Sequence, residues 1–254
     1  MRLLVDGPRA GATNMAIDEA LMDRGRRGDV TLRLYRWEPG CLSFGRNQTA
    51  RGRYDGDRAA ELGYEVVRRP TGGRSVLHHR ELTYAVTAPA DWGSLRDVYV
   101  RINRALAAGL RLLGVDASVQ DGSDGPAPRP TVRACFRDPL PGELTAAGRK
   151  LAGSAQWREA GALLQHGSLL LHNDQVVVER LRIGGPPAAE VPAVGLVELL
   201  RREPEAGELE TALANGFEHE LSVKVVPDTM TSRERRQAEQ LAAEYRDPAW
   251  TWRR

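Results

Sequence analysis

The sequence predicts an α+β fold, with a central mixed β-sheet packed with helices. Strand-like segments outnumber helical ones early in the chain. The strands expected at residues 64–68 and 81–87 follow one another without a helix between them, which argues against a regular βαβ array. Hydrophobic residues make up 41% of the 254 residues, so the chain can bury a sizeable core.

The spacing of apolar residues predicts three helices. The first covers residues 13–24, where apolar side chains recur at helical spacing. The second follows the capping residue Ser94 and closes at Gly114. The third begins at a capping box formed by Thr231 and Glu234, near the end of the chain.

Four segments are typical of strands. Residues 31–37, TLRLYRW, alternate apolar side chains with arginines, and residues 64–68 and 81–87 are rich in β-branched and aromatic residues. Residues 162–171, ALLQHGSLLL, are apolar enough for a long buried strand or a hairpin. These segments supply the expected central sheet.

Two segments rich in glycine and proline interrupt the pattern of elements. Residues 121–130, DGSDGPAPRP, are typical of a mobile loop, and residues 184–192 separate a large N-terminal part from a helical tail. We therefore expect a catalytic domain over residues 1–183 and a helical C-terminal appendage over 184–254 that packs on it.

Composition excludes several classes of protein. The formal net charge of +2 and the lack of a long basic run do not favour nucleic-acid binding. No apolar run approaches the length of about 18 residues that spans a bilayer, and the N-terminus lacks a signal-peptide pattern. Two cysteines do not make a disulfide framework. These features predict a protein of the reducing cytoplasm that binds neither nucleic acid nor membrane.

The first motif that could carry chemistry covers residues 68–79, RRPTGGRSVLHH, between two expected strands. Paired glycines allow close approach of the backbone to a ligand, and exposed N–H groups suit phosphate or carboxyl oxygens. The spacing is neither that of a Walker A loop nor that of a dinucleotide-binding loop. The alternative from these residues alone is an ordinary hairpin turn.

The second motif covers residues 148–155, GRKLAGSA. It holds Lys150, one of only two lysines among 36 basic residues. A lysine that remains where arginine is so strongly preferred indicates a need that arginine cannot meet. Small residues beside it leave space for a slender ligand. The alternative is a glycine-rich turn with a solvated lysine.

Cys135 is the candidate nucleophile, because Arg133 and Arg137 flank it and nearby cations lower a thiol pKa. An inert core cysteine is the alternative, and we expect Cys41 to be such a residue. His166 is equally compatible with a structural hydrogen-bonding role. No Cys and His residues show metal-ligand spacing.

In combination these segments resemble one family. The order is a helix containing NMAIDE at residues 14–19, then RRPTGGRSVLHH, GRKLAGSAQ and LLQHGSLLL. This order is similar to the lipoate side of the biotin/lipoate protein ligase catalytic-domain superfamily over about residues 1–180. The biotin branch uses a GRGRxG-type loop, which this chain lacks. The resemblance implies the fold of that superfamily.

Within the superfamily the chain is most similar to the cysteine-loop octanoyltransferases. Ligase loops commonly continue Thr-Gly-Gly with a third glycine and end in His-Asp, whereas this chain has Arg74 and His79 at those positions. Cys135, fifteen residues before Lys150, matches the nucleophile of the cysteine-loop type. The other octanoyltransferase type has a cysteine downstream of the His-Gly motif, and no cysteine follows residue 135 here.

The resemblance implies a two-step acyl transfer without a cofactor or metal. Cys135 would take octanoyl from acyl carrier protein as a thioester and pass it to a lysine of a lipoyl-domain protein, the glycine cleavage H protein or a 2-oxoacid dehydrogenase subunit. Lys150 would stabilise the thiolate and orient the acyl carbonyl. The implied acyl-binding residues are Arg69, Thr71, Gly72, Gly73, Arg74, Leu77, His79, Gly153, Ser154, Ala155, His166 and Gly167.

Three other functions remain open from the sequence. An ATP-dependent lipoate–protein ligase would use the same loop for an acyl-adenylate and would not need Cys135. A lipoyl amidotransferase would move lipoyl groups between lipoyl domains. A non-catalytic binding protein would keep the fold and lose the chemistry, and the presence of Cys135 together with Lys150 argues against it.

Overall fold

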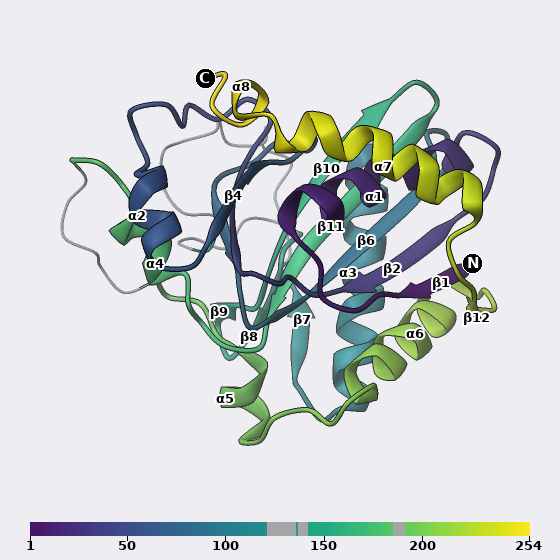
Figure 1. Ribbon diagram of the computed structural model, residues 1–254. Helices are drawn as coiled ribbons and strands as arrows, with labels where there is room; N and C mark the ends of the chain where they lie inside the picture. Colours follow the sequence, from purple (N-terminus) through teal and green to yellow (C-terminus); the bar gives the residue numbers. More distant parts are fainter. Residues whose placement is uncertain (121–135, 137–141, 185–190) are drawn as a thin grey trace.

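A six-stranded mixed sheet forms the centre of the molecule, as the α+β prediction required (Figure 1). The computed structural model describes residues 1–120, 136, 142–184 and 191–254. The strand order is β10 (Ala152–Glu159), β11 (Ala162–Leu170), β6 (Glu81–Pro89), β2 (Thr31–Tyr35), β1 (Arg2–Val5) and β12 (Val226–Pro227). The pairs β1–β2 and β1–β12 are parallel, and the other pairs are antiparallel.

Two smaller sheets flank this centre. One has the order β4 (Glu65–Arg68), β3 (Cys41–Phe44) and β5 (Val76–His78), and it carries both ends of the RRPTGGRSVLHH motif. The other has the order β7 (Ala117–Val119), β8 (Leu144–Ala146) and β9 (Arg149–Lys150). Lys150 therefore lies on a strand, just before β10.

Helices cover both faces of the large sheet. The helices α3 (Leu95–Leu112) and α6 (Glu208–Leu221) pack together in the core of one face, whereas α1 (Gly11–Gly25) and α7 (Ser232–Arg246) cover the other. Figure 1 shows α1 and α7 across the near face and α3 behind the strands. Four short helices complete the described chain: α2 (Gly56–Glu61), α4 (Val176–Arg180), α5 (Leu196–Leu200) and α8 (Pro248–Thr251).

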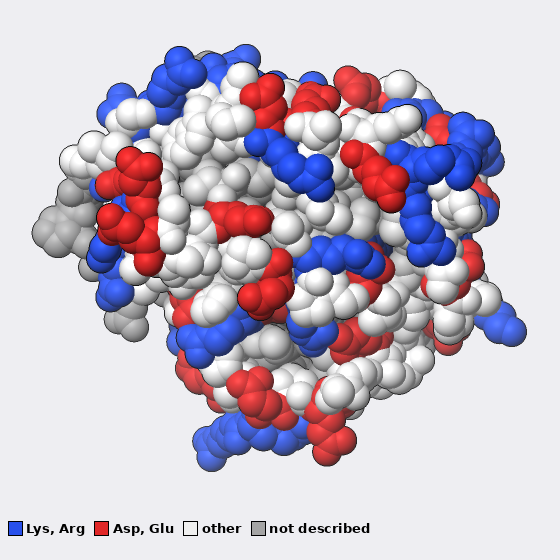
Figure 2. Space-filling view, in the orientation of Figure 1, with Lys and Arg blue, Asp and Glu red and all other residues white. Residues whose placement is uncertain are grey.

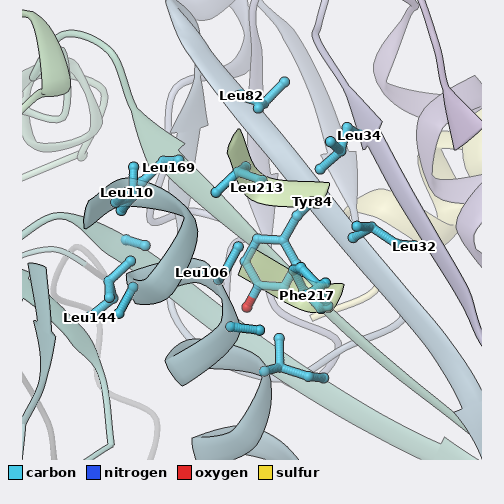
Figure 3. Packing of buried hydrophobic residues seen from close by; sticks show 14 of the residues in the cluster. Leu32, Leu34, Leu82, Tyr84, Leu106, Leu110, Leu144, Leu169, Leu213 and Phe217 are labelled. Atoms are coloured by element: carbon cyan, nitrogen blue, oxygen red, sulfur yellow. The ribbon is translucent and has the colours of Figure 1, made fainter. Parts of the chain in front are cut away.

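Side chains of the central strands alternate between two hydrophobic cores, because successive residues of a strand point to opposite faces. Leu32 and Leu34 of β2 join the core under α3 and α6, where Figure 3 shows them near Phe217. Arg33 and Tyr35 point to the α1 side. The predicted alternation in residues 31–37 is therefore real, but its arginine at position 33 is fully buried rather than solvated.

The predicted helices and strands agree closely with the structure. Helix α3 begins after Ser94, whose hydroxyl accepts the N–H of Asp97. The capping box of Thr231 and Glu234 is present at the start of α7. Residues 162–170 form one strand, β11, which pairs with β10. The expected loop at 121–130 lies outside the described residues.

The described helices and strand of the assigned C-terminal appendage contact the rest of the chain. Strand β12 extends the central sheet beside β1, so this part is not wholly helical. Helix α6 packs on α3, and α7 packs on α1. Residues 185–190, at the expected boundary, lie outside the described part. The division at residues 183 and 184 stays a prediction.

Candidate active site

A narrow cavity of about 30 Å³, partly open to solvent, lies on the α1 side of the central sheet. Its walls come from α1, the central strands and the small β4–β3–β5 sheet. The lining residues are Met15, Tyr35, Trp37, Arg69, Gly73, Val76, His78, Thr83, Gly153, Ser154, Ala155, His166, Gly167 and Ser168. All four of the segments that carry the family resemblance thus contribute residues to one cavity.

Arg69 holds the Thr-Gly-Gly loop in shape. Its Nη2 donates to the carbonyls of Gly72 and Arg74, at 2.8 and 2.6 Å. Its Nη1 donates to the hydroxyl of Ser43 at 3.0 Å. The two bonds to the turn fix its backbone and the bond to Ser43 ties it to β3, since the rigid fork of arginine loses little freedom in making them. The loop is therefore an organised wall rather than a loose turn.

His166 connects this loop to helix α1. Its Nε2 lies 2.7 Å from the hydroxyl of Thr71, and its Nδ1 lies 2.9 Å from Asp18 Oδ2. Asp18 also accepts from Arg33 at 2.7 Å and from the Tyr35 hydroxyl at 2.8 Å. Asp18 carries the negative charge, so Nδ1 is the ring's donor and Nε2 is left to accept the Thr71 hydroxyl.

Burial decides the protonation of this network. Burial lowers the pKa of His166, and it outweighs the hydrogen bond and charge of Asp18. Burial also pushes the pKa of Asp18 upward, but the His166 hydrogen bond and the Arg33 charge hold it below its ordinary value. The pair is thus a neutral imidazole on an ionised carboxylate, which is a positioning arrangement for Thr71.

A second buried network surrounds His78. Its ring stacks on Trp37 at a centroid distance of 4.0 Å. His78 Nε2 lies 2.8 Å from the Ser43 hydroxyl, and Nδ1 lies 2.9 Å from Glu81 Oε1. Ser168 also donates to Glu81 Oε1, at 3.0 Å. Since Arg69 bonds Ser43, the two networks share one scaffold and keep the floor of the cavity rigid.

Lys150 is buried, with 1% of its surface exposed, so the alternative of a solvated lysine is wrong. Its Nζ donates to Glu143 Oε1 at 2.6 Å and lies 5.4 Å from the centre of the Phe136 ring. Phe136 is fully buried and belongs to one apolar cluster with Val76, which lines the cavity. Lys150 and the residue after Cys135 are thus neighbours close to the cavity wall.

Small residues leave the cavity its width. A Cβ on Gly167 would lie 2.7 Å from the carbonyl oxygen of Gly153 and 2.8 Å from the Ser154 hydroxyl, so no larger residue fits there. Gly73 has a φ of +92° and lies beside Arg69, opposite Ala155. The Gly153–Ala155 segment, beside which a slender slot is expected, lines this cavity.

Most of the predicted acyl-binding residues gather at this cavity, but two do not. Thr71, Gly72 and Arg74 belong to the loop that forms its wall. Leu77 points away into a core with Leu42 and Phe44, because its neighbours on β5 take the cavity side. His79 Nδ1 lies 2.9 Å from Asp174, outside the cavity. Cys135 lies outside the described residues.

Sequence reasoning missed the buried polar network beneath the loop. Asp18 lies in the NMAIDE segment, but nothing in the sequence pairs it with Arg33 or His166, which are far away along the chain. One signal was present: Asp18 is a charged residue on the apolar face of a predicted helix. Such a residue must find buried partners.

Cys41 fits the expectation of an inert core thiol. It is fully buried on β3, and burial raises its pKa well above the ordinary value. Within the described residues, no three His, Cys, Asp or Glu side chains are grouped so that they could hold a metal ion. In that same part of the chain, no helix has both the length and the apolar character needed to cross a bilayer.

Comparison with known proteins indicates the same family that the sequence motifs resemble. Residues 10–218 match the family described as lipoyl protein ligase A/B catalytic domain. The chain is 40% identical over 270 residues to octanoyltransferase LipM of Kyrpidia tusciae, covering 100% of this chain and 98% of that protein. It is 39% identical over 267 residues to octanoyltransferase LipM of Moorella thermoacetica, with the same coverage.

Solved structures share the fold along the whole chain. A lipoate-protein ligase A bound with ATP superposes with a TM-score of 0.82 at 26% identity, covering 99% of this chain and 98% of that one. Protein Ta0514 of T. acidophilum, with bound lipoic acid, superposes with a TM-score of 0.80 at 25% identity, covering 100% of this chain and 99% of that one. The chain therefore belongs to the lipoyl protein ligase A/B catalytic domain family, and over its full length it is similar to octanoyltransferases.

Proposed function

We propose that this protein is an acyltransferase of protein lipoylation, which moves an octanoyl group from acyl carrier protein to a lysine of a lipoyl-domain protein through a thioester on Cys135. The observation that carries the proposal is the full-length similarity to octanoyltransferases at 40% identity, and the buried Lys150 next to Phe136, which follows Cys135 in the sequence, supports it. The similarity to ligases of known structure is lower, at 26%.

The chemistry proceeds in two balanced steps. In the first, the Cys135 thiolate attacks the octanoyl thioester, a bond forms between its sulfur and the acyl carbon, and the carrier thiol leaves and takes up a proton. In the second, the neutral amine of the acceptor lysine attacks the acyl-enzyme, an amide bond forms as the thioester bond breaks, Cys135 leaves as the thiolate, and the proton lost by the amine passes to solvent. A strong nucleophile thus divides one transfer into two easier displacements.

Lys150 supports both displacements. Its buried ammonium lies beside Phe136, the residue covalently bonded to Cys135. A positive charge in a water-poor site favours a thiolate and a developing oxyanion, and such stabilisation is commonly worth about 3 kcal/mol. Glu143 holds the lysine in place through the 2.6 Å ion pair.

The cavity supplies the acyl subsite. The Thr-Gly-Gly wall and the small residues of β10 leave a slot with an apolar side formed by Met15 and Val76. Arg69, Thr71 and His166 keep that wall in position. Because a thiol nucleophile must stay reduced, we place this protein in the cytoplasm.

The decisive experiment uses no acceptor and no ATP. Incubation with octanoyl-acyl carrier protein should increase the mass of the protein by one octanoyl group, and hydroxylamine should remove it, as expected of a thioester. Cys135→Ala should abolish the adduct. Cys41→Ala is the matched control and should keep both the adduct and the transfer activity, since its thiol is buried and its pKa is raised.

The ligase alternative makes the opposite prediction. If the protein mass stays unchanged without ATP, and transfer begins only when ATP and Mg²⁺ are added, the loop binds an acyl-adenylate and Cys135 is not the nucleophile. A lipoyl amidotransferase would form the adduct from a lipoylated protein rather than from octanoyl-acyl carrier protein. Comparing the two donors separates these outcomes.

A further inference from the structure

Four arginines gather beside the cavity wall. Arg46, Arg68, Arg253 and Arg254, here named the arginine patch, come from distant parts of the sequence. Arg253 Nη2 donates to the Arg46 carbonyl at 2.8 Å, and the Arg254 carbonyl accepts the backbone N–H groups of residues 50 and 51. The Arg46 N–H donates to the carbonyl of Thr71 at 2.7 Å. The patch therefore adjoins the Thr-Gly-Gly loop directly.

Among the described residues, no carboxylate oxygen lies within 4.0 Å of the four guanidinium groups of the patch. Arg68 is fully buried, and its donors reach the carbonyls of Thr251, Gly45 and Gln48 at 2.7 to 2.9 Å. Its Nη2 is buried without a partner. Glu19 interacts with Arg46, and Glu244 with Arg253, through their charges without an ion-pair contact.

Repulsion inside the patch makes it electrostatically unfavourable by itself. Burial, together with the charges of Arg253, Arg254 and Arg69, lowers the pKa of Arg68 to about 10. Burial and the charges of Arg46 and Arg254 also lower the pKa of Arg253. An arginine with a pKa of about 10 is still cationic at neutral pH. Like charges held this close together create a concentrated positive field, and a bound anion would reduce the repulsion between them.

Two of the arginines, Arg46 and Arg253, pack against tryptophan rings that hold them in position. The Arg253 guanidinium lies 3.7 Å from the centre of the Trp250 ring, and Arg46 lies 5.0 Å from that of Trp157. Trp157 follows the cavity-lining Ala155 by two residues on β10. Figure 2 shows blue side chains at the upper left edge, where Figure 1 has α8 and the C-terminus. Arg253 and Arg254 are exposed and Arg46 is half-buried, so these three charges of the patch reach solvent whereas Arg68 lies beneath them.

We propose, resting on the acyl transfer described above, that the arginine patch is the docking surface for the acyl donor, an acidic carrier protein whose thioester is held on a phosphodiester-linked tether. Arginine forks suit phosphate and carboxylate groups. The donor presents an anionic phosphodiester near its acyl group. The acceptor presents a lysine, whose ammonium a positive field repels, so charge favours the donor as the occupant.

The test compares two octanoyl donors in the acylation half-reaction, without acceptor. One is octanoyl-acyl carrier protein, and the other is the octanoyl thioester of N-acetylcysteamine, which is neutral and has no protein. The variant Arg253→Glu/Arg254→Glu should lower kcat/KM for the carrier-bound donor by about tenfold or more at low salt. Its kcat/KM for that donor should also depend less on ionic strength than the wild-type value does. For the neutral thioester, kcat/KM should change less than about twofold.

The matched control is Arg235→Glu/Arg236→Glu, which makes the same change in net charge at exposed positions of α7. Arg236 lies ten residues before the end of that helix at Arg246, or roughly 15 Å along its axis. The control should leave both donors unaffected. An equal loss for the two donors in the patch variant, an unchanged rate for the carrier-bound donor, or an effect confined to the acceptor would overturn the proposal. If wild type acylates with neither donor, the acyl transfer itself is wrong.

Discussion

At the scale of single residues, the site is built from charges that the fold has removed from water. Lys150 with Glu143 and Asp18 with Arg33 are both ion pairs of buried side chains. Such pairs add little net stability compared with apolar residues, but removing one partner leaves an uncompensated charge and costs about 3–5 kcal/mol. We infer that both pairs are kept for position and charge rather than for stability.

Lys150→Ala should abolish formation of the octanoyl adduct, and Lys150→Arg should largely fail as well. The buried site accommodates a slender ammonium beside Phe136, whereas a planar guanidinium is bulkier and directs its donors differently. Mass spectrometry of the acylation half-reaction measures the loss. Because either change can destabilise the fold, the paired variant Glu143→Gln/Lys150→Met should be made alongside. It should fold and yet fail to acylate, and near-normal turnover by it or by Lys150→Arg would contradict the role of Lys150.

The buried, neutral ring of His166 should make the stability of the protein depend on pH. Burial holds its pKa in the folded protein below the ordinary value of about 6.5. The unfolded chain therefore binds the proton more tightly, and the stability contributed by the neutral ring is complete above pH 6.5 and declines as the pH falls below it. The difference in free energy of unfolding between wild type and His166→Gln should thus become smaller as the pH falls from 7.5 to 5.

Urea unfolding at several pH values measures this difference. The range stays above the titration of Asp18, whose pKa is lowered and whose contribution would be lost only in stronger acid. His219→Gln is the control, because it removes one imidazole from the exposed surface of α6. If the two variants give the same pH profile, the buried network around Thr71 does not contain a neutral histidine.

At the scale of elements, α3 and α6 approach so closely that only glycine fits where they cross. A Cβ on Gly216 would lie 2.3 Å from the backbone nitrogen of Gly109 and 2.4 Å from the carbonyl oxygen of Ala105. Figure 3 shows the core that this crossing covers, with Leu213 and Phe217 of α6 near Tyr84. The glycines therefore set how deeply α6 packs over the sheet.

Gly216→Ala should destabilise the protein, although alanine is the better helix former by about 1 kcal/mol. Overpacking against rigid backbone costs about 1–3 kcal/mol or more, which exceeds that gain. Its neighbour Asn215 is exposed on the same helix, so Asn215→Ala should be neutral or stabilise by about 0.5 kcal/mol. Thermal unfolding of the two variants checks the prediction, and a higher Tm for Gly216→Ala would show that the helices can separate without loss.

Local signals explain why most elements were predictable. Capping residues such as Ser94 and Thr231 mark helix starts within four residues of sequence, and the structure uses both. Pairings between distant segments leave no such mark. The contact of His166 with Asp18, 148 positions away in the chain, depends on α1 crossing the sheet. The motifs could therefore be identified from the sequence, whereas the network that supports them could not.

At the scale of the whole molecule, the C-terminal segment completes three separate layers. Strand β12 pairs with β1, α6 covers one face of the central sheet, and α7 covers the other. The last residues also reach the small sheet: Arg68 Nε donates to the Thr251 carbonyl at 2.9 Å, and Trp250 Nε1 donates to the Arg68 carbonyl at 2.8 Å. Such contacts on every layer indicate that this segment contributes to one cooperative unit.

A chain ended after residue 183 should therefore fail to fold cooperatively. Without α6 and α7, buried residues on both faces of the sheet, among them Leu34, Tyr84 and Met15, would lose part of their apolar cover. Exposing apolar surface costs about 25 cal/mol per Å², and two uncovered helix-packing faces exceed the 5–15 kcal/mol by which a domain is stable. Full-length protein should unfold in one transition by calorimetry, and the shortened chain should show none. A sharp transition in the shortened chain, with retained acylation, would instead establish residues 184–254 as a separable appendage.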